Sequence, residues 1–152
     1  MSRVSRRRRW AAGFVVALLL PVAGCGDPTA DYCGALKEHN KDIAAMIGSD
    51  SPSALLGGLP TLRDLADQAP EDLKDEWQTF LDALDGLAGA IKDAGLKPSD
   101  FKGGRPPKGL TEKEQQAISE AANQIGTDDV VQASAGIEQQ ARDVCKVNLG
   151  LS

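Results

Sequence analysis

The chain has 152 residues and a formal net charge of −5, because 22 Asp and Glu outnumber 17 Lys and Arg. This length suffices for one domain with a hydrophobic core but is too short for a two-lobed transport receptor. The acidic excess argues against a nucleic-acid partner, because an acidic domain is repelled by phosphate backbones and by anionic lipid surfaces.

Residues 1–24 have the layout of a secretory signal peptide. Five arginines between Arg3 and Arg9 form a basic head without acidic residues, and an uncharged run follows from Trp10 to Ala23. As a helix, this run would span only about 21 Å of a hydrocarbon core that is ~30 Å thick, so we expect no permanent transmembrane helix. Removing residues 1–24 takes away five basic residues and no acidic one, which leaves a formal charge of −10.

The boundary Val22-Ala23-Gly24-Cys25 resembles the lipobox of bacterial lipoproteins, in which a branched residue and two small residues precede the modified cysteine. Small residues suit the peptidase that cuts there, and a thiolate is the nucleophile that takes up lipid. The resemblance implies that Cys25 receives a diacylglyceryl thioether and becomes the first residue after cleavage behind Gly24. Two acyl chains hold a protein stably at a membrane. The alternative is an ordinary cleavable signal with Cys25 as a spare cysteine, and the export route, general or twin-arginine, stays open.

Cys33 and Cys145 remain once Cys25 is assigned to lipid, and they form an even pair in a chain bound for an oxidising compartment. We predict that they form a disulfide, with two buried free thiols as the alternative. They stand near the start of the first expected helix and the end of the last. The bridge would therefore tie the two ends of the domain together.

Apolar residues recur at spacings of three and four along the rest of the chain, which predicts amphipathic helices. The first expected helix covers residues 31–47, and the second runs from Ser51-Pro52 to Ala69 with a kink or break near Pro60. A third helix runs from Pro70 to Gly95, and a fourth from a capping box at Thr111 and Glu114 to Gly126. The last helix is capped by Thr127, and its apolar stripe consists of Val130, Ser134, Ile137, Ala141 and Val144. We expect an all-α fold, a bundle of four or five helices over residues 31–147, between a tether at 25–30 and a tail at 148–152.

The helix after Pro70 carries the strongest apolar stripe. Its members are Leu73, Trp77, Phe80, Leu84, Leu87 and Ile91. Trp77 and Phe80 are large apolar groups, so we expect this helix to be the central member of the core. A ligand pocket around Trp77 and Phe80 is the second interpretation.

No pattern in the chain indicates catalysis, a metal or a cofactor. His39 is the only histidine, and no Ser or Cys nucleophile stands in a recognisable motif. One histidine supplies too few ligands for zinc, and the acidic residues around Pro70 lack the glycine-containing loop of a calcium site. We therefore expect a non-enzymatic protein with no cofactor, in which His39 is solvated.

Residues 95–110 form a long loop rich in Gly and Pro. Its charged residues are Lys97, Lys102, Arg105, Lys108 and Asp100. In one interpretation, Lys102, Arg105 and Lys108 contact an anionic partner, either a cell-wall polymer or an acidic protein surface. Phe101 would then be an apolar anchor for that partner. In the other interpretation, the loop is a flexible connector that its lysines keep soluble.

Four features stand together: the Asp31-Tyr32-Cys33 opening, the Pro70-Glu71-Asp72 helix start, the Trp77 stripe and the closing helix from Ile137 to Cys145. In this combination the chain resembles the small secreted lipoproteins of actinobacterial type. The resemblance covers nearly the whole chain and implies a location and an architecture, without an assigned active site.

We therefore expect a lipoprotein at the outer face of the cytoplasmic membrane that acts as a non-enzymatic interaction or accessory module for cell-envelope proteins. The alternative is a binding protein for a small or lipidic ligand held within the bundle.

Overall fold

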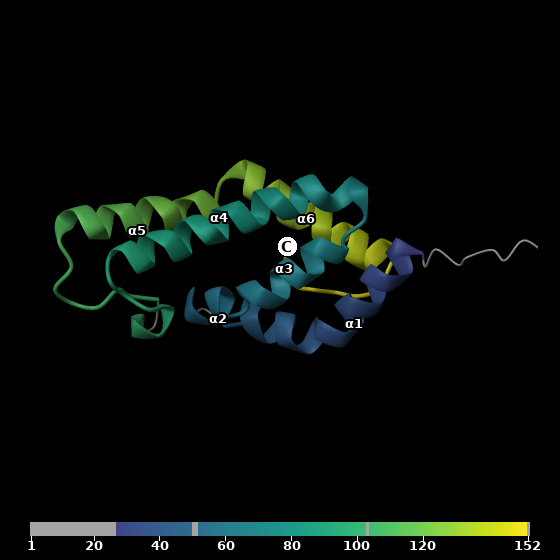
Figure 1. Cartoon of the computed structure of the whole chain (residues 1–152), viewed down its shortest axis with the longest axis horizontal. Coiled ribbons are helices and arrows are strands. Elements are labelled where there is room, and N and C mark those ends of the chain that lie inside the picture. The colour runs from purple at the N-terminus through teal and green to yellow at the C-terminus, as the bar shows by residue number, and fades with distance from the viewer. Residues whose placement is uncertain (1–26, 50–51, 103, 152) are drawn as a thin grey trace, which may run out of the picture.

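The computed structural model describes residues 27–49, 52–102 and 104–151, and these residues form an all-α fold, as predicted (Figure 1). Residues 1–26 lie outside the described residues, and so do the predicted signal peptide, the cleavage site behind Gly24 and the lipidation site Cys25. The elements are α1 (Pro28–Ile47), α2 (Pro52–Gly57), α3 (Leu59–Gln68), the 3-10 turn η1 (Glu71–Leu73), α4 (Lys74–Asp93), the 3-10 turn η2 (Pro98–Asp100), α5 (Glu112–Ile125) and α6 (Asp128–Asp143).

The helices form two layers. One layer contains α4 with α5 packed along its C-terminal half and α6 along its N-terminal half (Figure 1). The other layer contains α1, α2 and α3, with α3 running back beside α1. The layers meet where α3 packs against α4 and where η2 packs against α2.

The first helix begins at Pro28 rather than at Asp31. The carboxylate of Asp27 accepts a hydrogen bond from the Thr29 N–H at 3.0 Å and so caps the helix. Pro28 fits the first turn, where its missing N–H removes no helical hydrogen bond. Residues 28–30 therefore belong to α1 and not to the predicted tether.

The break predicted near Pro60 lies at Gly58, between α2 and α3. Pro60 stands in the first turn of α3, where a proline is tolerated. Gly58 packs closely against α1, because a Cβ atom at this position would overlap with the Sδ atom of Met46. Its φ of −85° is open to any residue, so a larger residue here would only have to displace the flexible Met46 side chain.

The stripe predicted on the helix after Pro70 is buried in full, which confirms α4 as the centre of the core. Trp77 and Phe80 pack edge to face, with ring centroids 6.3 Å apart. Gly95 ends this helix with a φ of +71°, and the Leu96 N–H donates to the Ile91 carbonyl at 3.0 Å.

Threonines precede both α5 and α6, and they act differently. The Thr111 N–H donates to Glu114 Oε2 at 2.8 Å, and the Glu114 N–H donates to Thr111 Oγ1 at 3.3 Å, which is the predicted capping box. The hydrogen bond from the Thr111 backbone lowers the pKa of Glu114. At α6 the predicted side-chain cap is absent, because the Thr127 hydroxyl donates back to the Gln124 carbonyl at 2.8 Å.

The end of the chain differs from the prediction. Helix α6 ends at Asp143, which leaves Val144 exposed over 46% of its surface instead of on the buried stripe. The predicted tail at 148–152 folds back instead, and Leu149 is only 2% exposed. Figure 1 shows this C-terminal segment running between the two layers. Its leucines are therefore part of the core.

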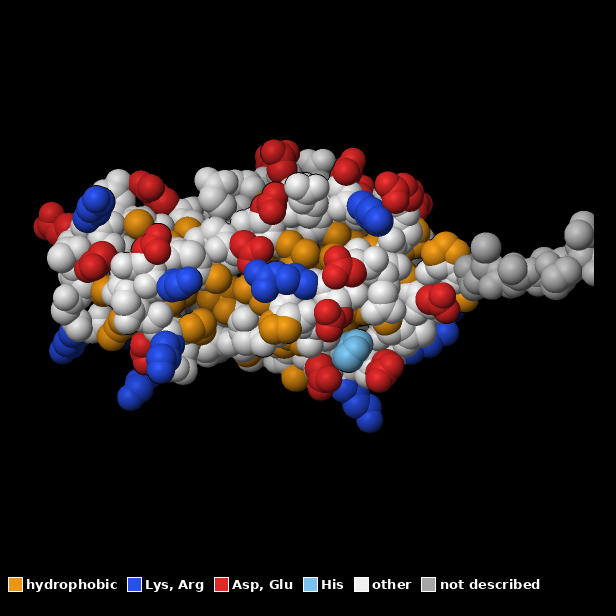
Figure 2. Space-filling model, viewed as in Figure 1, with side chains coloured by type: hydrophobic (Ala, Val, Ile, Leu, Met, Phe, Trp, Pro, Cys, Tyr) orange, Lys and Arg blue, Asp and Glu red, His pale blue; other side chains and the backbone are white. Residues whose placement is uncertain are grey.

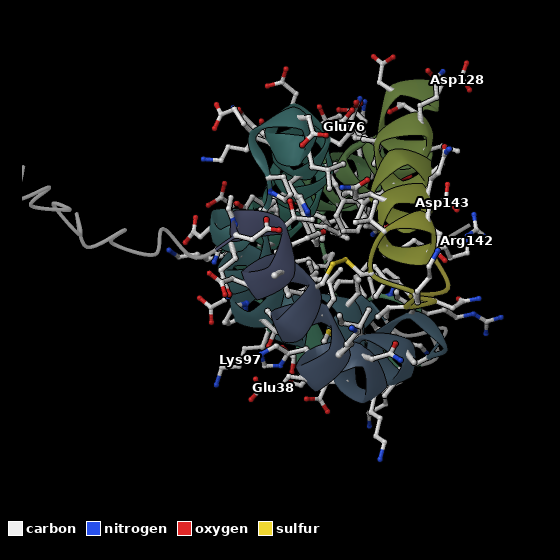
Figure 3. All side chains as sticks on the ribbon, turned by 90° about the vertical axis from the view of Figure 1, so that its right-hand side faces the viewer. Glu38, Glu76, Lys97, Asp128, Arg142 and Asp143 are labelled. Atoms are coloured by element: carbon white, nitrogen blue, oxygen red, sulfur yellow. A yellow bond between two sulfur atoms is a disulfide. The ribbon has the colours of Figure 1, made fainter. Side chains whose placement is uncertain are left out.

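Cys33 of α1 and Cys145, directly after α6, form the predicted disulfide, with Cα atoms 4.9 Å apart. Seen along the long axis of the molecule, the bridge lies between α1 and α6 (Figure 3). It joins the two layers covalently at the end where the described chain begins.

Candidate functional site

Two apolar hollows adjoin along α4 and α5. The first, of about 510 Å³, lies between the ends of α1 and α2 and the α4–α6 layer, and the second, of about 530 Å³, lies between α4, α5 and the 95–110 loop. Leu87 and Ala122 line both hollows, so we treat them as one groove, the α4–α5 groove. Its other apolar residues are Met46, Ile47, Leu55, Phe80, Ile125, Val130, Val131 and Leu151 in the first hollow and Ile91, Phe101, Pro106 and Ile118 in the second.

Part of this apolar lining reaches the surface. Val131, at the first hollow, is 53% exposed. An exposed apolar surface next to a hollow is typical of a place where something binds.

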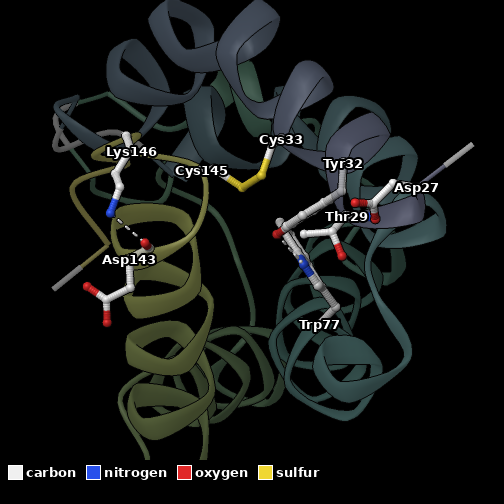
Figure 4. Close-up of a disulfide and its surroundings, with 8 residues drawn as sticks. All are labelled: Asp27, Thr29, Tyr32, Cys33, Trp77, Asp143, Cys145 and Lys146. Atoms are coloured by element: carbon white, nitrogen blue, oxygen red, sulfur yellow. Dashed lines mark hydrogen bonds between the residues drawn. A yellow bond between two sulfur atoms is a disulfide. The ribbon is translucent and has the colours of Figure 1, made fainter.

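The two aromatic residues that the sequence suggested as a pocket have different surroundings in the structure. Phe80 lines the first hollow, whereas Trp77 lines neither hollow. Trp77 Nε1 instead donates a hydrogen bond to the Tyr32 hydroxyl at 3.0 Å in the core (Figure 4). Burial raises the pKa of Tyr32 to about 12. Trp77 therefore supports the fold, and only Phe80 belongs to the groove.

The basic loop contributes to the second hollow. Phe101 is only 6% exposed and lines this hollow, so a partner would meet it inside the hollow, and its role as an apolar anchor stays a prediction. The backbones of Lys102 and Arg105 exchange two hydrogen bonds of 3.2 Å, which form a tight turn. Gly104 and Pro106 line the hollow on either side of Arg105, which places this residue at the rim.

The side chains of Lys102, Arg105 and Lys108 are exposed and pair with no carboxylate of the described residues. The nearby acids are engaged elsewhere: Asp100 accepts a hydrogen bond from the Lys97 N–H at 2.8 Å, and Glu120 accepts one from Gln116 Nε2 at 2.8 Å. Figure 2 shows Lys and Arg side chains at the end of the molecule where Figure 1 places this loop. Lys102 and Arg105 thus stand next in the chain to residues that line the second hollow, and neither has a carboxylate partner among the described residues.

A buried carboxylate fixes the C-terminal wall of the first hollow. Glu138 is 1% exposed, and its Oε2 accepts hydrogen bonds from the Leu149 N–H at 3.0 Å and the Leu151 N–H at 3.3 Å. Its Oε1 makes no hydrogen bond and lies 3.7 Å from Arg142 Nε. Leu151 lines the hollow because Glu138 holds its backbone in place.

The sequence contained a signal for Glu138 that the prediction did not use. This residue follows Ser134 by four positions and precedes Ala141 by three, which places it on the buried stripe of α6. A carboxylate on such a stripe needs hydrogen-bond donors, and here the folded-back segment supplies them.

A third and wider hollow, of about 900 Å³, lies over the first half of α1 and the junction of α3 and α4. His39 lines it, together with charged residues of both signs: Asp31, Glu38, Asp67, Glu71 and Lys74. Its mixed polar lining suits water better than an apolar ligand. Within the described residues, no group of three or more His, Cys, Asp or Glu side chains has an arrangement that could hold a metal ion.

Comparison of the chain with models of known families, with curated proteins and with solved structures finds no match. Among the helices of the described residues, none is both long and apolar enough to cross a membrane. The α4–α5 groove is thus the feature from which a function is inferred.

Proposed function

We propose that this protein is a non-catalytic binding module that takes an apolar ligand into the α4–α5 groove. The observation that carries the proposal is the pair of adjoining hollows that share Leu87 and Ala122. Each hollow, at about 510 and 530 Å³, falls within the range of ~300–1,000 Å³ that is usual for small-molecule sites.

The shape of the groove favours an elongated ligand. Phe80 lines its first hollow and Ile91 its second, and this part of α4 is about 16 Å long at a helical rise of ~1.5 Å per residue. Most side chains of the lining are apolar, and the polar ones are Ser49 and Ser134 in the first hollow and Gln115, Gln116 and Ser119 in the second. A single hydrocarbon chain matches this surface best, because the hydrophobic effect stabilises its burial without directional contacts.

The test places a large side chain where the two hollows adjoin. Ala122 lines both hollows and is exposed on α5, so Ala122→Phe should block binding of the neutral fluorescent probe N-phenyl-1-naphthylamine. Ala117→Phe is the matched control, since Ala117 is exposed on the same helix and lines neither hollow. We expect about tenfold weaker binding in Ala122→Phe only. Equal binding by the two variants, or no binding by the parent protein, would exclude the groove as the site.

The second candidate function is that of an interaction module for cell-envelope proteins. The observation that favours it is the exposure of Val131 beside the first hollow. A partner that docks there should be lost in Val131→Glu but retained in Val144→Glu, because Val144 is also exposed and does not line the hollow. Crosslinking in intact cells with each variant would distinguish this function from ligand binding.

The membrane anchor is part of the same proposal. The lipobox Val22-Ala23-Gly24-Cys25 supports lipidation of Cys25, and lipidation would hold the domain at the outer face of the cytoplasmic membrane. The test is the intact mass of the protein extracted from membranes in detergent. A mass that starts at Cys25 and includes a lipid increment supports the anchor, and an unlipidated mass contradicts it.

A further inference from the structure

We infer that the ligand of the α4–α5 groove is a single-chain amphiphile with an anionic head, a phosphate or a carboxylate. The chain lies in the groove and the head lies at the turn formed by Lys102 and Arg105. This inference rests on the proposed function and adds the charge of the ligand to it.

The first argument is the position of the turn. Arg105 stands between two residues that line the second hollow, and Lys102 directly follows Phe101, which lines it too. The two backbone hydrogen bonds between Lys102 and Arg105 hold the backbone of both residues beside the second hollow, and their long, exposed side chains can reach a head group there. A chain in the groove would place its polar end there.

The second argument is charge complementarity. The chain after residue 24 carries a formal charge of −10, yet the exposed side chains of Lys102, Arg105 and Lys108 pair with no carboxylate of the described residues. An anionic head would supply the missing partner. Repulsion from the rest of the domain is screened beyond about 8–10 Å at physiological ionic strength, so the nearest charges decide the binding of one small head group.

The third argument is the place of the turn in the molecule. Figure 1 shows the 95–110 loop at the opposite end of the long axis from the start of α1. A domain anchored through Cys25 would hold its acidic body near the membrane and this turn at the far end. The overall negative charge of the domain disfavours an anionic membrane surface as the partner of the turn, so a single amphiphile is the better match.

The experiment uses the full chain with Cys25→Ser, which cannot be lipidated, and titration calorimetry below the micelle concentrations of the probes. Dodecyl phosphate, dodecyl maltoside and dodecyltrimethylammonium share one chain and differ in head charge. We expect dodecyl phosphate to bind about tenfold more tightly than the maltoside, the effect of one or two exposed charge contacts. Lys102→Gln with Arg105→Gln should remove this preference, whereas Lys37→Gln with Lys41→Gln on α1 changes the net charge equally and should retain it.

Each outcome decides the inference. Equal binding of the three probes overturns it and leaves the proposed function intact, whereas no binding of any probe removes both. A phosphate preference that survives in Lys102→Gln with Arg105→Gln places the head elsewhere and overturns the inference. Inorganic phosphate that competes as well as dodecyl phosphate shows a head-group site without a chain, which also overturns it. Polyglutamate, an anionic polymer, serves as a further probe. If Lys102→Gln with Arg105→Gln loses the binding of polyglutamate but keeps the binding of dodecyl phosphate, the turn is a contact for an anionic polymer and the inference is overturned.

Discussion

Replacement of Glu138 by alanine tests whether one buried carboxylate holds the end of the chain. The two hydrogen bonds to Glu138 Oε2 come from the Leu149 and Leu151 N–H groups, and bonds to a charged group contribute roughly 1.5–3 kcal/mol each. Removing the carboxylate also removes the cost of burying it, so the full sum is not lost. We expect Glu138→Ala to lower the free energy of unfolding by about 3 kcal/mol, a large part of the ~5–15 kcal/mol typical of a domain.

The assay combines urea denaturation with amide hydrogen exchange. In Glu138→Ala, the Leu149 and Leu151 amides should exchange at least about tenfold faster, while the centre of α4 should stay protected. Glu120→Ala is the control, because Glu120 is exposed and its only hydrogen bond comes from a side chain; it should cost under ~0.5 kcal/mol. Unchanged protection of Leu149 in Glu138→Ala would refute the role of this carboxylate.

Three further predictions concern the fold. Cys33→Ala with Cys145→Ala should lower the free energy of unfolding in urea by about 5 kcal/mol, the chain-entropy value for residues 112 apart in sequence; a loss under ~1 kcal/mol would contradict this. Gly58→Ala should cost about 1 kcal/mol, because its methyl group displaces the flexible end of the Met46 side chain, whereas Gly57→Ala has open space and should be neutral or slightly stabilising; equal effects would exclude the packing explanation. Tyr32, the only tyrosine, has a pKa raised to about 12 in the folded protein and a value of 10.0 in the unfolded chain. The contribution of Tyr32 to the free energy of unfolding should be constant below pH 10 and fall as pH rises towards 12, and an absorbance titration with the same midpoint in folded and denatured protein would contradict the burial of Tyr32.

The helices could be predicted because their signals are local. The α4 stripe, the capping box at Thr111 and the disulfide follow from spacing, cap chemistry and cysteine count. The fold-back of the C-terminus was missed because it is not helical. Val147, Leu149 and Leu151 alternate with other residues, a period of two that indicates an extended segment with one buried side. That pattern is too short to stand out beside five helical segments.

The groove could not be predicted, because it depends on how the layers are spaced. Leu87 of α4 and Ala122 of α5 meet only after the 95–110 loop reverses the chain. Aromatic size favoured Trp77 and Phe80 equally, yet the Tyr32 hydroxyl gives the Trp77 indole a buried partner, and Phe80 has no such group to satisfy. The burial of Phe101 could not be predicted either, because it depends on the packing of the 95–110 loop over the second hollow.

The disulfide determines what a protease can do to this protein. The exposed 95–110 loop is the natural place for a cut, and Cys33 precedes it in the chain while Cys145 follows it. After one cut, α5 and α6 would remain covalently bound to α1, so the two fragments would separate on a gel only after reduction. Separation of the C-terminal half from the N-terminal half therefore requires two chemical events, hydrolysis of a peptide bond and reduction of the bridge.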